Sequence, residues 1–218
     1  MTTVSEKIDA KLVKELREKS GAPMGDCLKA LQETHGNIEE AFVVLRKRGI
    51  ASAQKKATRT TNEGAVGTYI HAGGKIGVLI ELNCESDFVA RTTDFQELLK
   101  DIAMHIAASD PRYVKPEDVT AADLEREKDI FRAQAAATGK PAPVIEKIVE
   151  GKMGKFYEEV CLLEQPFIKD QAVSIKELIA QKVGKLGENI TVRRFARFKV
   201  GAQDWTVAQT KAVEAAAE

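Results

Sequence analysis

Residues Gly64 to Ala90 read GAVGTYIHAGGKIGVLIELNCESDFVA and carry the strongest signals of secondary structure in the chain. Two predicted strands, 64–71 and 75–84, flank the turn Ala72-Gly73-Gly74. Glycine adopts positive φ angles without steric cost, so this pattern predicts a tight antiparallel hairpin. The glycines do not form a nucleotide-binding motif, because their spacing is not Gly-x-Gly-x-x-Gly and no helix follows them directly.

The last eight residues of this stretch, Asn83–Ala90, connect the second strand to a helix that begins near Thr93. Ser86 is a suitable N-cap for a helical turn, and Asp87 complements the helix dipole. By residue chemistry alone, Phe88 is expected to fold back into the core, as most aromatic side chains near a strand end do. The alternative is that Asp87 and Phe88 both point outward from a surface connection and meet a partner.

Composition limits the classes of function. The chain has 218 residues, 44% of them hydrophobic and 30% charged, and its 33 basic residues balance its 33 acidic ones. This balance lacks the basic excess of a dedicated nucleic-acid-binding protein. Membrane-spanning and signal segments need longer apolar runs than this chain contains, so we expect a cytoplasmic protein. Cys27, Cys84 and Cys161 are widely spaced among apolar residues, which predicts a reducing compartment and no metal site. We also expect no cofactor.

Residues 1–50 form a separate pattern of three short helices. Apolar residues recur at helical spacing, Asn37 and Glu40 form a capping-box pair before the third helix, and Gly49 is expected to end it. The segment between the first two helices, Ala22-Pro23-Met24-Gly25, and the start of the third helix, Gly36–Ala41, resemble those of a ubiquitin-associated-type docking domain. Residues 51–63 are basic and lack large apolar side chains, so they are predicted to form a linker.

Residues 64–201 are predicted to form an α+β core domain, followed by a flexible tail at 202–218 in which Trp205 is the candidate for docking. Thr93 and Gln96 form a capping-box pair at the start of the helix after the hairpin, and apolar residues recur along this helix at helical spacing. Three further helices follow, at about 120–138, after Pro141 and from Ser174 to about Lys185. A third strand at Asn189–Val200 would join the hairpin in a three-stranded antiparallel sheet packed with helices.

The alternation in that strand predicts two faces. Ile190, Val192, Ala196, Phe198 and Val200 would share one face, and Thr191, Arg193, Phe195, Arg197 and Lys199 the other. The second face would place Phe195 between arginines, as in a small single-stranded nucleic-acid platform. The alternative is that these arginines protect the sheet against aggregation.

Six runs, taken in order over residues 5–200, resemble the elongation factor Ts family. They are Val13-Lys14-Glu15-Leu16-Arg17, Gly21-Ala22-Pro23-Met24, Asn83–Ala90, Ala103-Met104-His105-Ile106-Ala107-Ala108, Glu164-Gln165-Pro166-Phe167, and Gly187-Glu188-Asn189-Ile190 ahead of Arg193-Arg194-Phe195. The resemblance implies a guanine-nucleotide exchange factor for elongation factor Tu that promotes GDP release during translation and is not an enzyme. The chain resembles the short form of the family, which lacks a long coiled-coil insertion.

The resemblance also implies the site. The family signature Thr-Asp-Phe-Val corresponds to Ser86, Asp87, Phe88 and Val89, with serine in place of threonine but the hydroxyl retained. In the family, the aspartate and phenylalanine reach the partner's nucleotide-binding domain near its magnesium.

Secondary contacts with the partner are implied for Arg17, Met24 and His105, and Gly25 stands where many relatives have a second methionine. Short-form relatives can pair through the core sheet, sometimes with a cysteine in the last strand. This strand has no cysteine, so a covalent dimer is not expected, whereas a non-covalent homodimer through the core sheet stays open as an alternative to a monomer. Neither a membrane nor a specific nucleic acid is expected as a partner.

Two other functions compete with this interpretation. One is a ribosome- or RNA-associated adaptor that uses the three-helix domain and the basic face of the last strand, in which case binding should fall steeply with salt. The other is a small hydrolase that uses Cys84 or Cys161 with His105, although no nucleophile and base lie near each other in the sequence.

Overall fold

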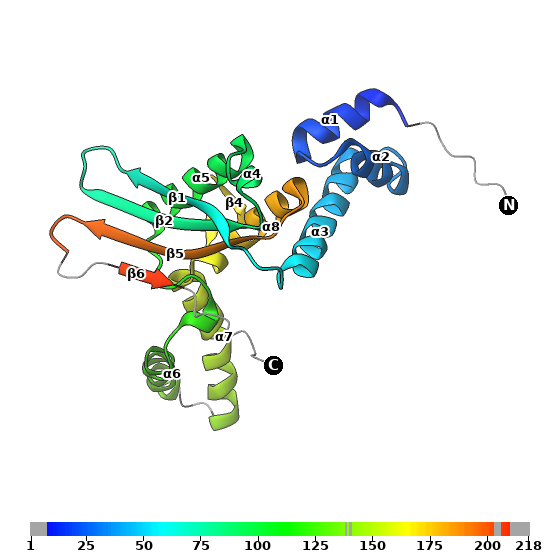
Figure 1. Cartoon of the computed structure of the whole chain (residues 1–218). Coiled ribbons are helices and arrows are strands. Elements are labelled where there is room, and N and C mark those ends of the chain that lie inside the picture. Colours follow the sequence, from blue (N-terminus) through cyan, green and yellow to red (C-terminus); the bar gives the residue numbers. More distant parts are fainter. Residues whose placement is uncertain (1–7, 138, 140, 203–205, 210–218) are drawn as a thin grey trace, which may run out of the picture. The chain divides into compact units, whose positions relative to one another are not determined.

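The structure is a computed structural model that describes residues 8–137, 139, 141–202 and 206–209 (Figure 1). It has the predicted α+β class, with helices at the amino-terminal end of the chain followed by an antiparallel sheet packed with helices. The chain forms two compact units. One contains the described residues of Met1–Gly64 with Cys84–Phe95 and Glu177–Thr191, and the other contains Ala65–Asn83, Gln96–Lys176 and the described residues of Val192–Glu218. The domain limits 1–50, 51–63 and 64–201 stay a prediction.

Three helices open the first unit: α1 Ala10–Ser20, α2 Met24–Glu33 and α3 Ile38–Lys56. Asn37 caps α3 by accepting the amide hydrogens of Glu39 and Glu40, and its Nδ2 donates to Glu40 Oε1 at 2.9 Å, as the pairing of Asn37 with Glu40 predicted. Together the three helices enclose a small core made of Val13, Leu16, Cys27, Ala30, Leu31, Ala41 and Leu45.

Gly49 does not end the third helix, contrary to the sequence prediction. Helix α3 continues to Lys56, so the first part of the expected linker is helical. The glycine serves a packing purpose, because a Cβ added at Gly184 of helix α8 (Ile175–Leu186) would lie 3.4 Å from Gly49 Cα. Arg46 and Glu177 add an ion pair of 2.7 Å between the same two helices. Gly49 therefore allows two helices to approach closely.

The second unit contains most of a four-stranded sheet in the order β1-β2-β5-β6. Its strands are β1 Glu63–Ile70, β2 Ile76–Cys84, β5 Ile190–Lys199 and β6 Thr206–Gln209. Gly73 and Gly74 have φ angles of 86° and 67°, as the predicted hairpin requires. Strand β6 pairs antiparallel with β5 and was not predicted. Residues 203–205, including Trp205, and 210–218 lie outside the described residues.

The predicted faces of β5 are wrong beyond Val192. Arg193 and Arg194 are both exposed, and the alternation then shifts by one residue, so that Phe195 is buried and Phe198 is exposed. The buried Arg197 donates to the Ala107 carbonyl at 3.1 Å and pairs with Asp110 at 3.0 Å. Phe195 therefore cannot stack with a nucleic-acid base, and the proposed basic platform does not exist.

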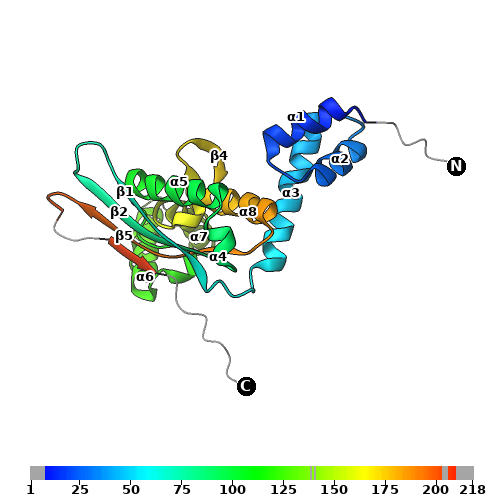
Figure 2. The same ribbon diagram turned by 45° about the horizontal axis from the view of Figure 1, so that its top comes forward.

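Helix α5 Thr93–Ser109 lies along one face of the sheet (Figures 1 and 2). The approach is close, since a Cβ at Gly67 in β1 would lie 2.6 Å from Leu99 Cγ. The cap also differs from the prediction: Thr92 Oγ1 accepts the Phe95 amide hydrogen at 3.3 Å, three residues ahead. The apolar face of this helix is buried, and so are alternate apolar residues of β2; the buried residues are Leu98, Leu99, Ile102 and Ile106 in α5 and Val78, Ile80 and Leu82 in β2.

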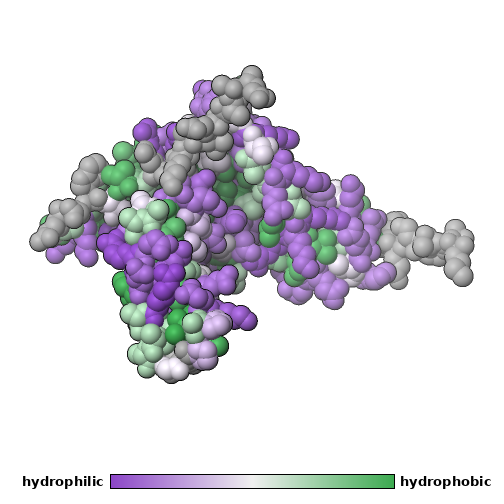
Figure 3. Space-filling model, turned by 90° about the horizontal axis from the view of Figure 1, so that it is seen from below, coloured by the Kyte–Doolittle hydropathy of each residue, from purple (hydrophilic) through white to green (hydrophobic). Residues whose placement is uncertain are grey.

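Helices α6 Ala121–Ala136 and α7 Ala142–Val160 form a hairpin beyond the sheet (Figure 1). A satellite core of Val119, Met153, Phe156, Val160 and Cys161 lies at its base. The remaining short elements are η1 Pro116–Asp118, η2 Leu162–Glu164, β3 Pro166–Phe167 and β4 Asp170–Ser174, of which β3 and β4 pair with each other. On the face shown in Figure 3, hydrophilic residues predominate and hydrophobic ones occur in small groups.

Candidate functional site

Residues Ser86–Val89 form a capped helical turn directly after β2. Ser86 is the N-cap of α4 (Asp87–Ala90) with φ −132° and ψ 154°, and its Oγ accepts the Val89 amide hydrogen at 3.4 Å. The carbonyl of Ser86 accepts from Ala90 at 3.3 Å. Serine therefore supplies the cap that was expected in place of the family threonine.

The side chains of this turn point in opposite directions. Phe88 exposes 79% of its surface, whereas Ala90 is buried. Asp87 is half-exposed and pairs with the exposed Arg91 one turn later, at 2.7 Å. The interpretation of Phe88 as a core residue is thus wrong, because the buried side of the turn is occupied by Ala90.

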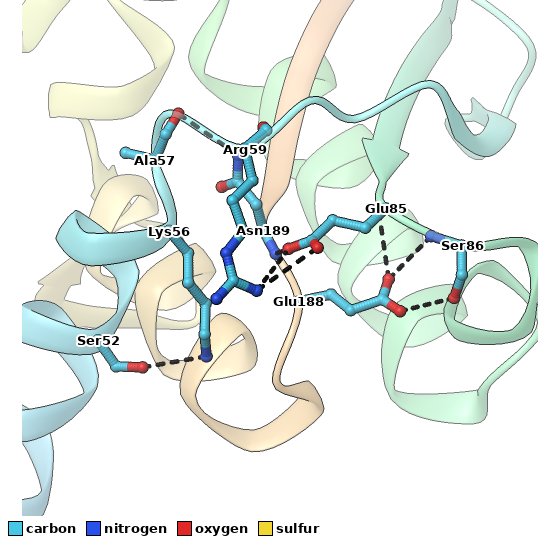
Figure 4. A network of polar contacts seen from close by, with 8 residues as sticks. All are labelled: Ser52, Lys56, Ala57, Arg59, Glu85, Ser86, Glu188 and Asn189. Atoms are coloured by element: carbon cyan, nitrogen blue, oxygen red, sulfur yellow. Dashed lines mark hydrogen bonds and ion pairs between the residues drawn. The ribbon is translucent and has the colours of Figure 1, made fainter.

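Glu188, more than 100 positions away in the sequence, accepts hydrogen bonds from the residues that begin the turn (Figure 4). Its Oε1 accepts the Ser86 hydroxyl hydrogen at 2.6 Å, and its Oε2 accepts the amide hydrogens of Glu85 and Ser86 at 3.1 and 3.0 Å. Glu188 had no predicted role, although it lies in one of the runs that carry the family resemblance. Only the fold brings it to Ser86.

A second carboxylate, that of Glu85, accepts a hydrogen bond in the opposite direction, from the segment that carries Glu188 (Figure 4). Glu85 Oε1 accepts the Asn189 amide hydrogen at 2.6 Å and lies 3.4 Å from Arg59 Nη1. The Asn189 side chain donates to the Arg59 carbonyl at 2.9 Å. The turn, the segment after α8 and the segment after α3 are therefore joined in one polar network.

The cysteines offer no nucleophile. Cys27, Cys84 and Cys161 are free and buried. Burial raises the pKa of the Cys84 thiol, with a further contribution from the Glu188 charge, and burial raises the pKa of Cys161 to about 12. Both thiols stay protonated at neutral pH, which argues against the cysteine hydrolase.

His105 lies in the interior of the second unit. The Ile168 amide donates to its Nδ1 at 3.3 Å, so Nε2 carries the ring proton and donates to Gln165 Oε1 at 2.9 Å. Burial lowers the pKa of the ring, which is therefore neutral at pH 7. A direct contact between His105 and a partner does not follow from this structure, since the side chain is fully buried.

Arg17 and Met24, the other two implied contact residues, are exposed on α1 and α2. Met24 exposes 47% of its surface and Leu28, one turn later, 38%. Gly25 has no atom within 4 Å of an added Cβ, so space for a larger side chain exists there. The structure thus groups Ser86, Asp87, Phe88 and Val89 in one turn and leaves Arg17 and Met24 on separate helices.

Metal and membrane chemistry find no support in the described ranges. Within them, no group of three or more histidine, cysteine, aspartate or glutamate side chains is arranged to hold a metal ion. No described helix is both long enough and apolar enough to cross a bilayer.

Comparison with known proteins identifies the family. The family model for elongation factor TS matches residues 3–202, which include the whole capped turn. The chain belongs to the elongation factor Ts family. It is 70% identical to elongation factor Ts of Koribacter versatilis over 205 residues, which cover 94% of each chain. Its identity to elongation factor Ts of Solibacter usitatus is 61% over 194 residues, covering 89% of this chain and 92% of the relative.

A third relative, elongation factor Ts of Geobacter sulfurreducens, is 57% identical over 194 residues, which cover 89% of this chain and 90% of the relative. These matches cover most of this chain and most of each relative, so the resemblance is not limited to the six runs. Membership in the elongation factor Ts family implies nucleotide exchange on elongation factor Tu during translation.

Proposed function

We propose that this chain promotes GDP release from elongation factor Tu by presenting Phe88 and Asp87 to the partner's magnesium and nucleotide site. One observation carries the proposal: a phenylalanine that is 79% exposed stands on a turn whose other side is anchored in the fold. Full burial of such an exposed apolar side chain against a partner would contribute about 1.5 to 3 kcal/mol of favourable free energy to binding.

Asp87 supplies a charge beside this wedge. Its carboxylate is half-exposed and is paired only across the surface to Arg91, an interaction worth roughly 0.3–0.5 kcal/mol in such helix pairs. The carboxylate is therefore available to accept a charge-assisted hydrogen bond from the partner. Val89 is half-buried and donates its amide hydrogen to the Ser86 cap, so its role is to hold the turn.

The magnesium ion in this mechanism belongs to the partner. Magnesium requires nearly octahedral coordination at short distances, so a small displacement of the partner's ligands weakens the metal and the nucleotide together. Binding is reciprocal: if the factor weakens GDP binding a thousandfold, GDP weakens factor binding by the same ratio, about 4 kcal/mol. The chain then accelerates exchange without making or breaking a covalent bond.

The three-helix region provides a second grip in this proposal. Arg17, Met24 and Leu28 are exposed on its first two helices and supply charge and apolar area. His105 acts indirectly, since its ring ties α5 to the segment around Gln165 and Ile168. We place the protein in the cytoplasm, where translation occurs.

We also propose a non-covalent homodimer through the sheet. Exposed apolar side chains lie on its strands, among them Val66, Ile70, Leu79 and Phe198, and the exposed Val200 directly follows β5. Several of them line one hollow of about 380 Å³, together with Thr68, Gly74, Lys75, Gly77 and Val78. Strand β5 contains no cysteine, which leaves apolar contact as the force that would hold two copies together.

Gel filtration with elongation factor Tu and GDP tests the proposed partner. The two proteins should co-elute with little GDP, and excess GDP with magnesium should separate them, because metal and nucleotide oppose the factor. If the chain elutes alone under both conditions and the GDP content of elongation factor Tu does not change, the proposed function is wrong.

A further inference from the structure

We infer that Glu188 is a positioning residue, which fixes the direction of Asp87 and Phe88 through the Ser86 cap and thereby sets the maximal rate of GDP release. The inference rests on the proposed function and concerns a residue outside the signature turn. It predicts that loss of Glu188 lowers the rate at saturating factor much more than it weakens binding.

Helix α4 is too short to fix the orientation of Asp87 and Phe88 by itself. Helix α4 has four residues, and a helix of one turn is unstable without outside contacts. Glu188 supplies these contacts with both carboxylate oxygens, which accept three hydrogens from Glu85 and Ser86. Hydrogen bonds to a charged acceptor are stronger than those between neutral groups.

The Ser86 hydroxyl links the carboxylate to the helix. It donates its single hydrogen to Glu188 Oε1 at 2.6 Å, which leaves its lone pairs to accept the Val89 amide hydrogen at 3.4 Å. Glu188 therefore determines the rotation of the hydroxyl, and the hydroxyl caps the turn that carries Phe88.

The base of this arrangement is itself fixed. Glu85 accepts the Asn189 amide hydrogen, so each of the two neighbouring segments provides a carboxylate for the backbone of the other (Figure 4). The Asn189 side chain also holds the Arg59 carbonyl, and the Arg59 guanidinium returns to Glu85. Glu188 therefore belongs to a network that joins three chain segments, and its position does not depend on the turn alone.

The rate and the affinity should respond differently. A wedge is effective only within about 0.5 Å and 10–20° of its working geometry. Arg17 and Met24 lie on other helices, so their proposed contacts do not depend on the direction of the turn. A misdirected turn thus lowers the maximal rate and leaves most of the binding.

The test measures GDP release from elongation factor Tu by stopped flow over a range of factor concentrations, for Glu188→Ala, Glu188→Gln, Phe88→Ala and the double variant Glu188→Ala with Phe88→Ala. Asp101→Ala is the matched control, because the partly buried Asp101 carboxylate bonds to Lys169 at 2.7 Å and contacts no atom of the turn network described above. Thermal unfolding verifies that each variant is folded.

Glu188→Ala should lower the maximal rate on the order of tenfold or more, while the half-saturating concentration changes less. Glu188→Gln should stay within about threefold of the parent, since its amide oxygen still accepts from the two backbone amides. In the Phe88→Ala background, the loss of Glu188 should add less than about a twofold effect, because both changes act through one side chain. Asp101→Ala should match the parent.

Hydrogen exchange of the free chain gives a readout without the partner. Amides of residues 85–90 should exchange faster in Glu188→Ala and near the parent rate in Glu188→Gln. If Glu188→Ala does not fold, Glu188→Asp takes its place, because its carboxylate is one methylene shorter.

An unchanged maximal rate in Glu188→Ala, unchanged exchange in the turn, an equal loss in the Phe88→Ala background, or a glutamine variant as slow as the alanine variant would each overturn the inference. A Phe88→Ala variant with full activity would instead overturn the proposed function.

Discussion

Phe88 and Phe195 occupy opposite environments within this fold. Phe88 lies on the turn after β2 and exposes 79% of its surface, whereas Phe195 lies in β5 and exposes 2%. Each position follows from its backbone. The Ser86 cap directs Phe88 outward, and the two consecutive exposed arginines before Phe195 turn that ring inward. The same residue type therefore serves recognition in one region and core packing in the other.

The largest expected effect tests the buried side of this comparison. Phe195→Ala removes a fully enclosed ring and leaves a cavity, so the free energy of unfolding should fall by about 3–5 kcal/mol. Denaturant unfolding followed by circular dichroism measures the change. A loss below about 1 kcal/mol would mean that Phe195 is not a core residue and would undo the contrast with Phe88.

Asp87→Ala tests the contribution of the exposed turn that carries Phe88. Asp87→Ala removes the carboxylate beside Phe88 but leaves the wedge, so the maximal rate of GDP release should fall by about tenfold, close to the value of one charge-assisted hydrogen bond. Stopped-flow exchange provides the rate. Arg91→Ala is the control, because it removes the surface partner of Asp87 and should slow exchange little. Equal losses in both variants would assign the effect to the ion pair.

His105 offers a pH test of the buried interior. Burial lowers the pKa of its ring below the ordinary value near 6.5, so the unfolded chain takes up a proton at a higher pH than the folded chain does. The stability that the neutral ring contributes is present above about pH 6.5 and is lost as the pH falls toward the folded pKa. Thermal unfolding between pH 8 and 5.5 should show a shallower decline for His105→Gln than for the parent. Parallel declines would contradict a buried neutral ring.

Arg194 gives the smallest expected effect. It is exposed beside Phe195 and pairs with Glu81 at 2.6 Å across neighbouring strands. Such surface pairs contribute roughly 0–1 kcal/mol, so Arg194→Ala should change the free energy of unfolding by no more than this amount. Denaturant unfolding alongside Phe195→Ala checks it. A loss as large as that of Phe195→Ala would mean that the arginine, not the ring, faces the core.

Local sequence signals were sufficient for much of the fold. The glycines of the hairpin, the Asn37 cap and the apolar periodicity of α5 each act within a few residues, and each predicted its element. Strand β6 was missed because four residues, Thr206–Gln209, carry too little pattern to stand out from a tail. The faces of β5 were missed because a shift of one residue reverses every later position.

The residues of the site also differ in whether the local sequence could predict them. The Ser86 cap could be predicted, since a hydroxyl and the amide three residues ahead lie on one short stretch. The direction of Phe88 could not be predicted from residue chemistry and was implied only by the family resemblance. Glu188 could not be assigned a role, because its contact with Ser86 joins positions 102 residues apart. Contacts of that range depend on the whole fold.

The role of Phe88 in GDP release can be measured by stopped flow, with a fluorescent GDP analogue on elongation factor Tu and with the parent chain, Phe88→Ala and Ile130→Ala. Ile130 on α6 is also an exposed large apolar side chain, at 44%, and it serves as the matched control. Phe88→Ala should unfold like the parent yet lose on the order of a hundredfold in acceleration, whereas Ile130→Ala should keep it. A folded Phe88→Ala variant that releases GDP as fast as the parent would contradict the account.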